Sequence, residues 1–261
     1  MAVHAPEIAG KAKAGQFVIV RLDDEGERIP LTIADFSGKD GTVTLVVQKA
    51  GFTTAKMVGL NEGDRLNDIA GPLGKPTRIE KTGHVVCIGG GVGIAPVYPI
   101  SRAFKEAGSR VTAVLAARSG GLIFWEDRFR NTADEVLVFT DDGSLGCKGL
   151  ATDALDVIAA NGGKPGLVVA VGPVIMMKFV SLKTKDAGIR TVVSLNPVMV
   201  DGTGMCGGCR VTVGGKTYFA CVDGPEFDGH LVDFDELISR QSFYAEEEKA
   251  ARHKCRMTAG R

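Results

Sequence analysis

The stretch HVVCIGGGVGIAPVYPI, residues 84–100, decides the fold of this chain. HVVCI is a continuous apolar run of strand length, which predicts a strand buried on both faces. A glycine run follows at once, and we expect Pro96 to open a helix because proline suits the first helical turn. That helix has one apolar face, made of Val97, Ile100, Ala103, Phe104 and Ala107. A strand, a tight turn and a helix in this order predict the first unit of an α/β domain.

The strand–helix alternation continues as far as residue 195. We predict further strands at 111–117, 135–141, 167–172 and 191–195, with helical segments at 97–107, 150–160 and 174–186. Such alternation places helices on both faces of a parallel sheet. Upstream, residues 16–76 alternate with β periodicity and carry Gly/Asp turns, which predicts a small antiparallel β barrel. We therefore assign a barrel to residues 1–76, the α/β domain to 77–195 and a small C-terminal module to 196–261, closed by a helix from about Asp235.

Length and charge limit the classes of function. A prior of about one domain per 150 residues gives two domains or slightly more for 261 residues. The 31 basic and 31 acidic residues balance, so no global field attracts nucleic acid or an anionic membrane. No apolar segment reaches the roughly 18 residues of a membrane span, and the N-terminus lacks a signal-peptide core. We expect a cytoplasmic protein with neither nucleic acid nor a membrane as its partner.

The most specific motif is DGTGMCGGCRVTVGGKTYFAC, residues 201–221. It reads D-x4-C-x2-C-x11-C and resembles the plant-type iron–sulfur spacing with Asp201 in place of the first cysteine. The candidate ligands are Asp201, Cys206, Cys209 and Cys221. A [2Fe-2S] cluster at this loop would make the chain a one-electron carrier.

Two other interpretations of the loop stay open. A zinc ion also accepts three Cys and one Asp, although zinc sites usually pair C-x2-C with a second such motif. Alternatively, the thiols are buried small apolar groups without a metal. We interpret Cys87 as a core residue, Cys147 as a turn residue and Cys255 as part of a polar tail.

The glycine run between the first parallel strand and its helix is a candidate dinucleotide site. Its position can present backbone N–H groups and a helix N-terminus to a pyrophosphate. The run departs from G-x-G-x-x-G, so a plain tight turn is the alternative. Its residues are Gly89, Gly90, Gly91, Val92, Gly93, Ile94, Ala95 and Pro96. Four residues after neighbouring strands fall at the same carboxyl edge of the sheet, where ligands bind in open α/β folds: Arg118, Asp141, Gly172 and Pro173.

In the predicted barrel, the strand Arg28-Ile29-Pro30-Leu31-Thr32 combines a guanidinium that can grip a phosphate with a hydroxyl that can reach a flavin ring nitrogen. By composition alone this segment is only a strand. The stretch 46–54 offers backbone and hydroxyl donors in a loop, with Gln48, Gly51, Thr53 and Thr54 as its polar and glycine positions.

Taken in order, R-x-P-L-T, GGGVGIAP and the Asp/Cys ligands resemble the ferredoxin-reductase superfamily, specifically the electron-transfer subunits of dihydroorotate dehydrogenase and their relatives. The tract 191–230 is most similar to the small-subunit group of NADH-dependent reduced ferredoxin:NADP oxidoreductases, also known as sulfide dehydrogenase subunits. The resemblance implies FAD, NAD(H) and a [2Fe-2S] cluster as cofactors. By matched positions it assigns the flavin to Arg28, Pro30, Leu31, Thr32, Gly51, Thr53 and Thr54, the nicotinamide nucleotide to Gly89–Pro96, and the cluster to Asp201, Cys206, Cys209 and Cys221. Gln48, in the same stretch as Gly51, is a further candidate for the flavin site.

The resemblance also implies a partner: a larger iron–sulfur flavoprotein subunit related to the small subunit of glutamate synthase, linking NADH to ferredoxin and NADP. Relatives have more residues before the equivalent of APEIAGKAKAGQFVIV, enough for a first barrel strand, so we expect either that Met1 is an internal methionine taken as the start or that the barrel lacks part of an edge. Two other functions stay open, an electron-transfer subunit for dihydroorotate oxidation, where four Cys are expected, and a zinc-containing nucleotide sensor. The preference between NADH and NADPH also stays open, because Arg118 could read a 2′-phosphate.

Overall fold

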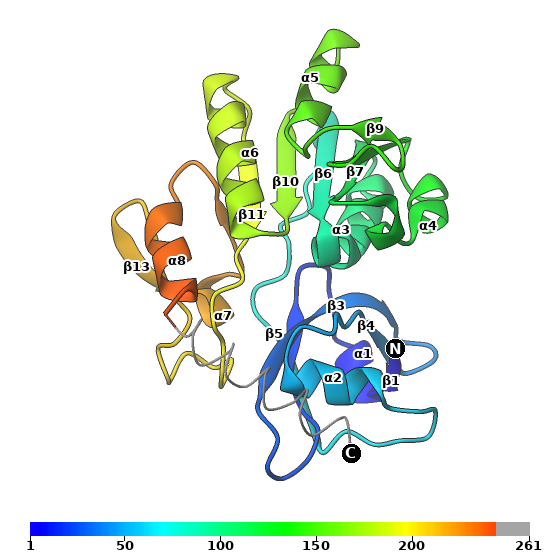
Figure 1. The fold of residues 1–261 in the computed structure, drawn as a ribbon, viewed down its shortest axis with the longest axis vertical. Coiled ribbons are helices and arrows are strands. Elements are labelled where there is room, and N and C mark those ends of the chain that lie inside the picture. The colour runs from blue at the N-terminus through cyan, green and yellow to red at the C-terminus, as the bar shows by residue number, and fades with distance from the viewer. Residues whose placement is uncertain (244–261) are drawn as a thin grey trace.

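The structure, a computed structural model, describes residues 1–243; the predicted C-terminal helix is present within them as Phe234–Gln241, and Cys255 lies outside the described residues. Figure 1 shows three bodies: a β-rich lower part, an α/β upper part and a smaller body beside both. We refer to them as the barrel segment (1–76), the nucleotide segment (77–195) and the cluster segment (from 196), divisions that we keep as a proposal. Among the described residues, no helix is long and apolar enough to cross a membrane.

The barrel segment is a curled antiparallel sheet of five strands in the order β1-β4-β3-β2-β5. The two edge strands, β1 and β5, do not pair with each other. The predicted barrel is therefore an open, curled sheet. Residues 2–4 supply an edge strand that pairs with 42–44. The elements are β1 (Ala2–His4), α1 (Pro6–Ala9), β2 (Phe17–Arg21), β3 (Ile29–Ser37), β4 (Thr42–Leu45), α2 (Phe52–Val58) and β5 (Asp68–Leu73).

The nucleotide segment is built on a seven-stranded sheet in the order β14-β11-β10-β6-β7-β8-β9. Six strands run parallel, five of them predicted and β9 not, whereas β14 is antiparallel and comes from the cluster segment. Its elements are β6 (His84–Gly90), a 3-10 turn (Gly91–Gly93), α3 (Ile94–Glu106), β7 (Arg110–Ala117), a second 3-10 turn (Gly120–Leu122), α4 (Glu126–Arg130), β8 (Glu135–Thr140), β9 (Cys147–Lys148), α5 (Asp153–Ala160), β10 (Leu167–Val171), α6 (Val174–Asp186) and β11 (Thr191–Ser194).

Strand β6 shows why the sheet is buried on both faces. Val85 and Cys87 point into the core under α3 and α4, whereas Val86 and Ile88 point into the core under α5 and α6. Successive side chains of a strand alternate between faces, so a continuous apolar run fits a sheet with helices on each side. The interpretation of Cys87 as a core residue is confirmed, since it is fully buried.

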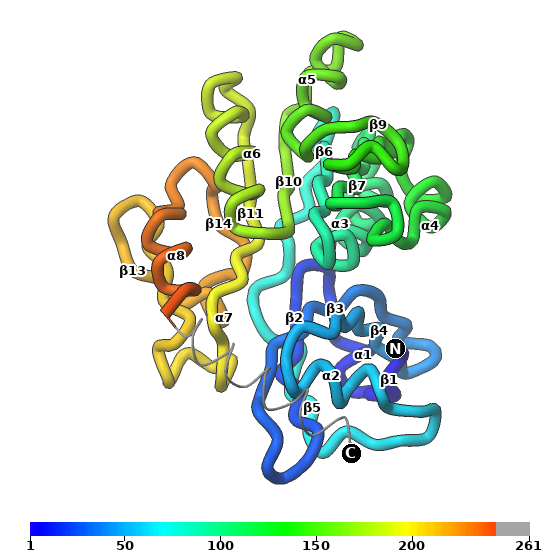
Figure 2. Tube along the Cα trace, viewed as in Figure 1, coloured from blue at the N-terminus to red at the C-terminus, as the bar shows by residue number. Residues whose placement is uncertain are grey.

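Within residues 196–243, the cluster segment contains a hairpin and two short helices, shown in yellow to red in Figures 1 and 2. Its elements are β12 (Arg210–Val213), β13 (Lys216–Phe219), α7 (Ala220–Asp223), β14 (Glu226–Asp228) and α8 (Phe234–Gln241). Buried residues of this segment join the core beneath α6, so it packs onto the α/β sheet directly. The predicted small iron–sulfur module is therefore present as a compact segment, but it shares a strand with the sheet beside it.

Three local predictions were wrong. Helix α3 begins at Ile94, after a 3-10 turn, and Pro96 is its third residue. The stretch 46–54 is not all loop, because α2 begins at Phe52. Cys147 lies in the two-residue strand β9 instead of a turn.

Candidate functional site

One cleft of about 1270 Å³ is lined by residues of all three segments. It exceeds the roughly 300–1,000 Å³ that is typical of a pocket for one small ligand. Its lining includes most of the residues predicted for the two nucleotide cofactors: Pro30, Leu31, Thr32, Gln48, Gly90, Gly91, Val92, Gly93, Ala95, Pro96, Arg118, Asp141, Gly172 and Pro173. The structure thus brings the flavin-strand and glycine-run candidates to one cavity.

The glycine run, residues 89–96, forms one wall of the cleft, and close backbone packing fixes its conformation. A Cβ on Gly93 would lie 2.1 Å from the carbonyl oxygen of Val171, at the end of the neighbouring strand β10. At Gly91 the backbone has φ +56° and a Cβ would meet nothing within 4 Å, so this position faces open space. The run therefore packs tightly on one side and leaves room for a ligand on the other. Gly89 and Ile94, which are buried, do not line the cleft.

The barrel wall of the cleft comes from β3 and the strand paired with it. Thr32 lies opposite Phe17 and Pro30 lies opposite Ile19 in the β2–β3 register. Phe17 joins Pro30 and Thr32 in lining the cleft. The alternation of the strand places Pro30 and Thr32 on one face, and Leu31 between them also contributes to the cleft lining.

Four of the predicted flavin residues do not line the cleft: Arg28, Gly51, Thr53 and Thr54. The hydroxyl of Thr53 donates to the carboxylate of Glu27 at 2.7 Å. The hydroxyl of Thr54 accepts from the backbone N–H groups of Ala50 and Gly51. Both threonine hydroxyls thus form their hydrogen bonds within the barrel segment.

In the cluster loop, residues 201–209, backbone N–H groups hold Asp201 by hydrogen bonds. Its two carboxylate oxygens accept from the N–H groups of Thr203 and Cys206, each at 2.7 Å. The bond from Thr203 is the main cause that lowers the pKa of Asp201, so this group is a carboxylate. The Cys206 side chain is exposed and its sulfur accepts a hydrogen bond from Gly208 N–H at 3.5 Å.

The other two candidate ligands are buried side by side. The sulfurs of Cys209 and Cys221 lie 3.2 Å apart, and both residues are 1% exposed. Burial, together with the neighbouring Cys209, raises the pKa of the free Cys221 thiol to about 12. Among residues 1–243, no three carboxylate, thiol or imidazole groups gather closely enough to hold one metal ion.

The four donors form two pairs, one joining Asp201 to the backbone of Cys206 and the other joining the sulfurs of Cys209 and Cys221. A [2Fe-2S] cluster takes two protein ligands at each of two irons, whereas a structural zinc takes four at one ion. The paired donor set fits the two-iron group better than a single zinc ion.

The cluster loop also packs on the barrel segment. A Cβ on Gly202 would lie 2.9 Å from Ile19 and 2.7 Å from Leu73. Ile19 is the cross-strand partner of the cleft residue Pro30. The residue next to Asp201 therefore packs against β2, the strand that contributes Phe17 to the cleft lining.

Sequence reasoning missed the contribution of the cluster segment to the cleft. The residues concerned are Asn196, Pro197, Met199 and Pro225, together with Ser194 and Leu195 at the end of the nucleotide segment. Asn196 and Pro197 directly follow β11, so the rule that ligands bind at the carboxyl edge of parallel strands would have found them. Nothing local marks Pro225, which reaches the cleft because β14 pairs with β11.

Comparison with known proteins identifies the class of fold to which this chain belongs. The chain aligns with a solved cytochrome P450 reductase from Amycolatopsis at 26% identity and a TM-score of 0.57, covering 67% of this chain and 57% of that one. Residues 196–233 match the family described as "Iron-sulfur cluster binding domain of dihydroorotate dehydrogenase B". A ferredoxin-reductase-like fold that carries an iron–sulfur domain defines the class: an oxidoreductase subunit for electron transfer.

The relatives define the family. The chain is 50% identical over 258 residues to the "Dihydroorotate dehydrogenase B (NAD(+)), electron transfer subunit homolog" of Thermotoga maritima, covering 99% of this chain and 91% of that protein. It is 32% identical to the corresponding electron transfer subunit of Shouchella clausii, covering 83% and 85%. The chain belongs to the family of dihydroorotate dehydrogenase B electron transfer subunits and their homologues.

A solved structure is closely similar over nearly the whole chain. It is described as "Insights into flavin-based electron bifurcation via the NADH-dependent reduced ferredoxin-NADP oxidoreductase structure". Its TM-score is 0.91 at 49% identity, covering 97% of this chain and 91% of that one. The predicted resemblance is thereby confirmed, and the family and fold support FAD, a [2Fe-2S] cluster and NAD(H) as cofactors.

Proposed function

We propose that this chain passes electrons between NADH and a larger partner subunit, with FAD and a [2Fe-2S] cluster as intermediate carriers. The nicotinamide nucleotide would bind at the glycine run and at the sheet edge formed by Arg118, Asp141, Gly172 and Pro173. The flavin ring would lie against Pro30, Leu31 and Thr32, and Asp201, Cys206, Cys209 and Cys221 would hold the cluster. When bound, FAD supplies the conversion between two-electron hydride chemistry and single-electron transfer.

The observation that carries this proposal is the shared cleft. Thr32 of the barrel segment, Gly91 of the nucleotide segment and Asn196 of the cluster segment line one cavity. Hydride transfer requires the two reacting rings to be in contact, and positioning of this kind is the main contribution of the protein in a cofactor enzyme. The contact of Gly202 with Ile19 gives the cluster loop a short path to the same wall.

The carboxylate of Asp141 at the sheet edge favours NADH over NADPH. Asp141 and Arg118 line the cleft next to each other in space, since the N–H of Asp141 donates to the carbonyl oxygen of Ala117. A carboxylate at this edge accepts the ribose 2′-OH of NADH and repels a 2′-phosphate. The description of the Thermotoga maritima relative as NAD(+)-linked supports the same choice.

The partner would dock over the cluster loop. Met205 is 85% exposed beside the candidate ligand Cys206, and Val198, Val200 and Val222 are also exposed apolar side chains near it. Exposed apolar residues gathered around a redox centre suit a protein interface. We propose that the partner is a larger iron–sulfur flavoprotein related to the small subunit of glutamate synthase, which connects this chain to ferredoxin and NADP. The similar solved structure, described as an NADH-dependent reduced ferredoxin-NADP oxidoreductase, supports the link to ferredoxin and NADP.

A second candidate function is the electron-transfer subunit of a dihydroorotate-oxidising enzyme, which is favoured by the family match over residues 196–233. Asp201 argues for the first function, because the dihydroorotate group is expected to have a cysteine at that position. Assays of the purified complex with dihydroorotate and with reduced ferredoxin plus NADP would separate the two.

The central test is reduction of the reconstituted protein under anaerobic conditions. NADH should bleach the flavin absorbance within seconds, and NADPH should do so more slowly. Metal analysis of anaerobically purified protein should find two irons and two acid-labile sulfides per chain. Flavin that stays oxidised with NADH would refute the hydride step, and zinc in place of iron would refute the electron-transfer role.

A further inference from the structure

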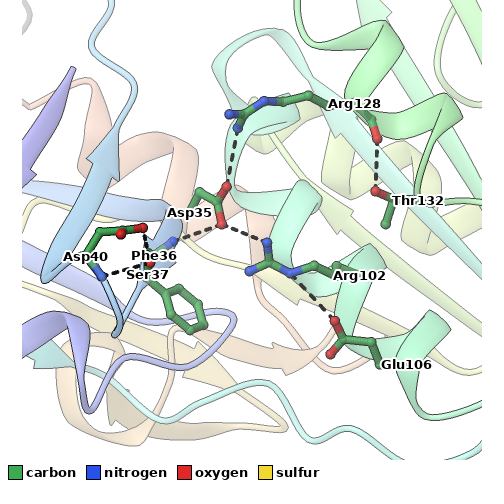
Figure 3. A network of polar contacts seen from close by, with 8 residues as sticks. All are labelled: Asp35, Phe36, Ser37, Asp40, Arg102, Glu106, Arg128 and Thr132. Carbon is green, nitrogen blue, oxygen red and sulfur yellow. Dashed lines mark hydrogen bonds and ion pairs between the residues drawn. The ribbon is translucent and has the colours of Figure 1, made fainter.

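Asp35 connects the barrel segment to two helices of the nucleotide segment (Figure 3). Its carboxylate accepts from the guanidinium of Arg102 in α3 at 2.8 Å and from that of Arg128 in α4 at 3.4 Å. It also accepts from the N–H of Phe36 at 2.9 Å, so its own orientation is fixed. We call Asp35, Arg102 and Arg128 the Asp35 clamp.

Aromatic rings hold both guanidinium groups of the clamp. Arg102 lies 5.6 Å from the ring centroid of Phe36 and 5.5 Å from that of Tyr98. Arg128 lies 5.5 Å from Tyr98 and 4.6 Å from the ring of Trp125. Arginine stacked on aromatic faces and bonded to a carboxylate has little freedom to move, which makes the contact geometrically specific.

The backbone at both sides of the clamp departs from regular geometry. The β3–β4 register shifts between Ile33 and Asp35, and such a bulge redirects a side chain. Trp125 has φ +60°, a conformation that is uncommon for a bulky residue and persists where surrounding contacts enforce it. Both irregularities direct side chains into the contact between the two segments.

The clamp joins the two elements that carry the walls of the cleft. Thr32 lines the cleft from β3, three residues before Asp35. Pro96 lines it from the first turn of α3, the helix that carries Arg102. Fixing Asp35 against Arg102 therefore fixes the separation between the flavin wall and the nicotinamide wall.

We propose that Asp35 is a positioning residue that sets the approach of the nicotinamide to the flavin, an inference that rests on the function proposed above. In the step concerned, a C–H bond of reduced nicotinamide breaks and the hydrogen passes to the flavin with both electrons. The nicotinamide is oxidised and the flavin is reduced by the same pair. Misplacement by about 1 Å can slow such a step by on the order of 100-fold.

The first test measures whether the Asp35 clamp is formed in the protein without any cofactor. Trp125 is the single tryptophan of the chain, so its fluorescence in the full-length cofactor-free protein reports the stacking of Arg128. Raising the salt concentration from 0.05 to 1 M should shift the emission, because screening weakens a partly exposed ion pair. Asp35→Asn should show the high-salt emission at every salt concentration. Glu126→Gln is the matched control, since it removes an ion pair with Arg130 inside α4 and should keep the wild-type response.

The second test measures hydride transfer in the FAD-loaded protein by anaerobic stopped flow. Asp35→Asn should lower the rate of flavin reduction at saturating NADH by tenfold or more, with FAD content and NADH affinity within twofold of wild type. Asp35→Glu should restore most of the rate. Arg128→Gln gives a second variant if Asp35→Asn folds poorly, because Arg128 is about half exposed.

The outcomes are distinct. An unchanged Trp125 emission in Asp35→Asn, or changed emission with a wild-type rate of reduction, would overturn the positioning role. Failure of NADH to reduce the flavin in wild type as well would instead overturn the proposed function, and the inference with it. A slow Asp35→Asn beside a normal Glu126→Gln would support the inference.

Discussion

Thr77 and Glu226, 149 positions apart in the chain, share a 2.6 Å hydrogen bond in which the Thr77 hydroxyl donates to the carboxylate. Thr77 lies in the connection between β5 and β6, and Glu226 begins β14. Two residues before Thr77, the N–H of Lys75 donates to the carbonyl oxygen of Gly224 at 2.6 Å. These bonds attach the cluster segment to the connection between the other two segments. All three segments therefore meet at residues 75–77 and 224–226.

Glu226 should make stability depend on pH. Its burial raises its pKa from 4.5 to about 7, and the Thr77 hydrogen bond offsets only part of that rise. Because the folded state keeps the proton to higher pH than the unfolded state, the free energy of unfolding should fall as pH rises from about 4.5 to about 7. The size is on the order of 3 kcal/mol, and the effect should level off above pH 7. Urea unfolding at pH 5 and pH 8 measures it.

The comparison with Glu226→Gln isolates this group from others that titrate in the same range. His84, whose pKa is lowered by burial, acts in the opposite sense, because its protonation at low pH destabilises the fold. Subtracting the two profiles removes that contribution. Glu62→Gln, at an exposed position, should leave the wild-type slope unchanged. Equal slopes in wild type and Glu226→Gln would show that folding does not raise the pKa of Glu226.

Gly93→Ala should disrupt the glycine run by steric overlap alone. The backbone there has φ −60°, which alanine adopts freely, but its Cβ would lie 2.1 Å from the Val171 carbonyl oxygen. Overpacking of this kind costs about 1–3 kcal/mol, and the shifted loop should also bind NADH more weakly. Thermal unfolding and NADH titration are the measurements. Gly121→Ala, where a Cβ meets nothing within 4 Å, should behave as wild type.

The sequence predicted the α/β sheet well because each buried strand carries its own apolar signal. The strands β6, β7, β8, β10 and β11 lie within one or two residues of their predicted bounds. In contrast, β14 has the sequence EFD between Pro225 and Gly229, and it forms only because β11 offers a free edge. The hairpin RVTVGGKTYF, residues 210–219, did carry a Gly-Gly turn signal that sequence reasoning did not use.

The motifs of the candidate site could be predicted from the sequence, but the contacts between segments that enclose the cleft could not. Thr32 and Gly91 were identified from local patterns, since a flavin strand and a glycine turn keep their residues close in sequence. Asp35 carries no such signal, because its role depends on Arg102 and Arg128, which reach it only after the two segments fold together. Contacts between segments are set by tertiary packing, which periodicity does not encode.

Asp141→Asn should weaken the preference for NADH. Removing the carboxylate at the sheet edge removes repulsion of a 2′-phosphate while Arg118 stays available to bind it. We expect kcat/KM for NADPH relative to NADH to rise about tenfold, which corresponds to about 1.4 kcal/mol. Steady-state rates with both nucleotides give the ratio. A ratio that stays at the wild-type value would place Asp141 away from the ribose.

Cys206→Ser should remove iron without damaging the fold. Cys206 is exposed, so a serine there leaves no buried cavity, yet it removes one of the four proposed ligands. Iron per chain and visible absorbance should fall sharply, while the unfolding temperature of the iron-free protein should match that of wild type prepared without iron. Cys147→Ser, at another exposed thiol, should retain a full complement of iron. Full iron in Cys206→Ser would exclude Cys206 as a ligand.

Asp201→Cys should lower the reduction potential of the cluster. A carboxylate donates less charge to iron than a thiolate, and ligand identity is one of the factors that set the potential. Asp201 also accepts backbone hydrogen bonds from Thr203 and Cys206, so it could serve only to fix the turn. Asp201→Asn separates the two roles, because the amide oxygen still accepts a hydrogen bond but ligates iron poorly. If Asp201 is a ligand, an electrochemical titration should find a lower midpoint in Asp201→Cys and loss of iron in Asp201→Asn. If it only fixes the turn, both variants should keep the wild-type midpoint and iron content.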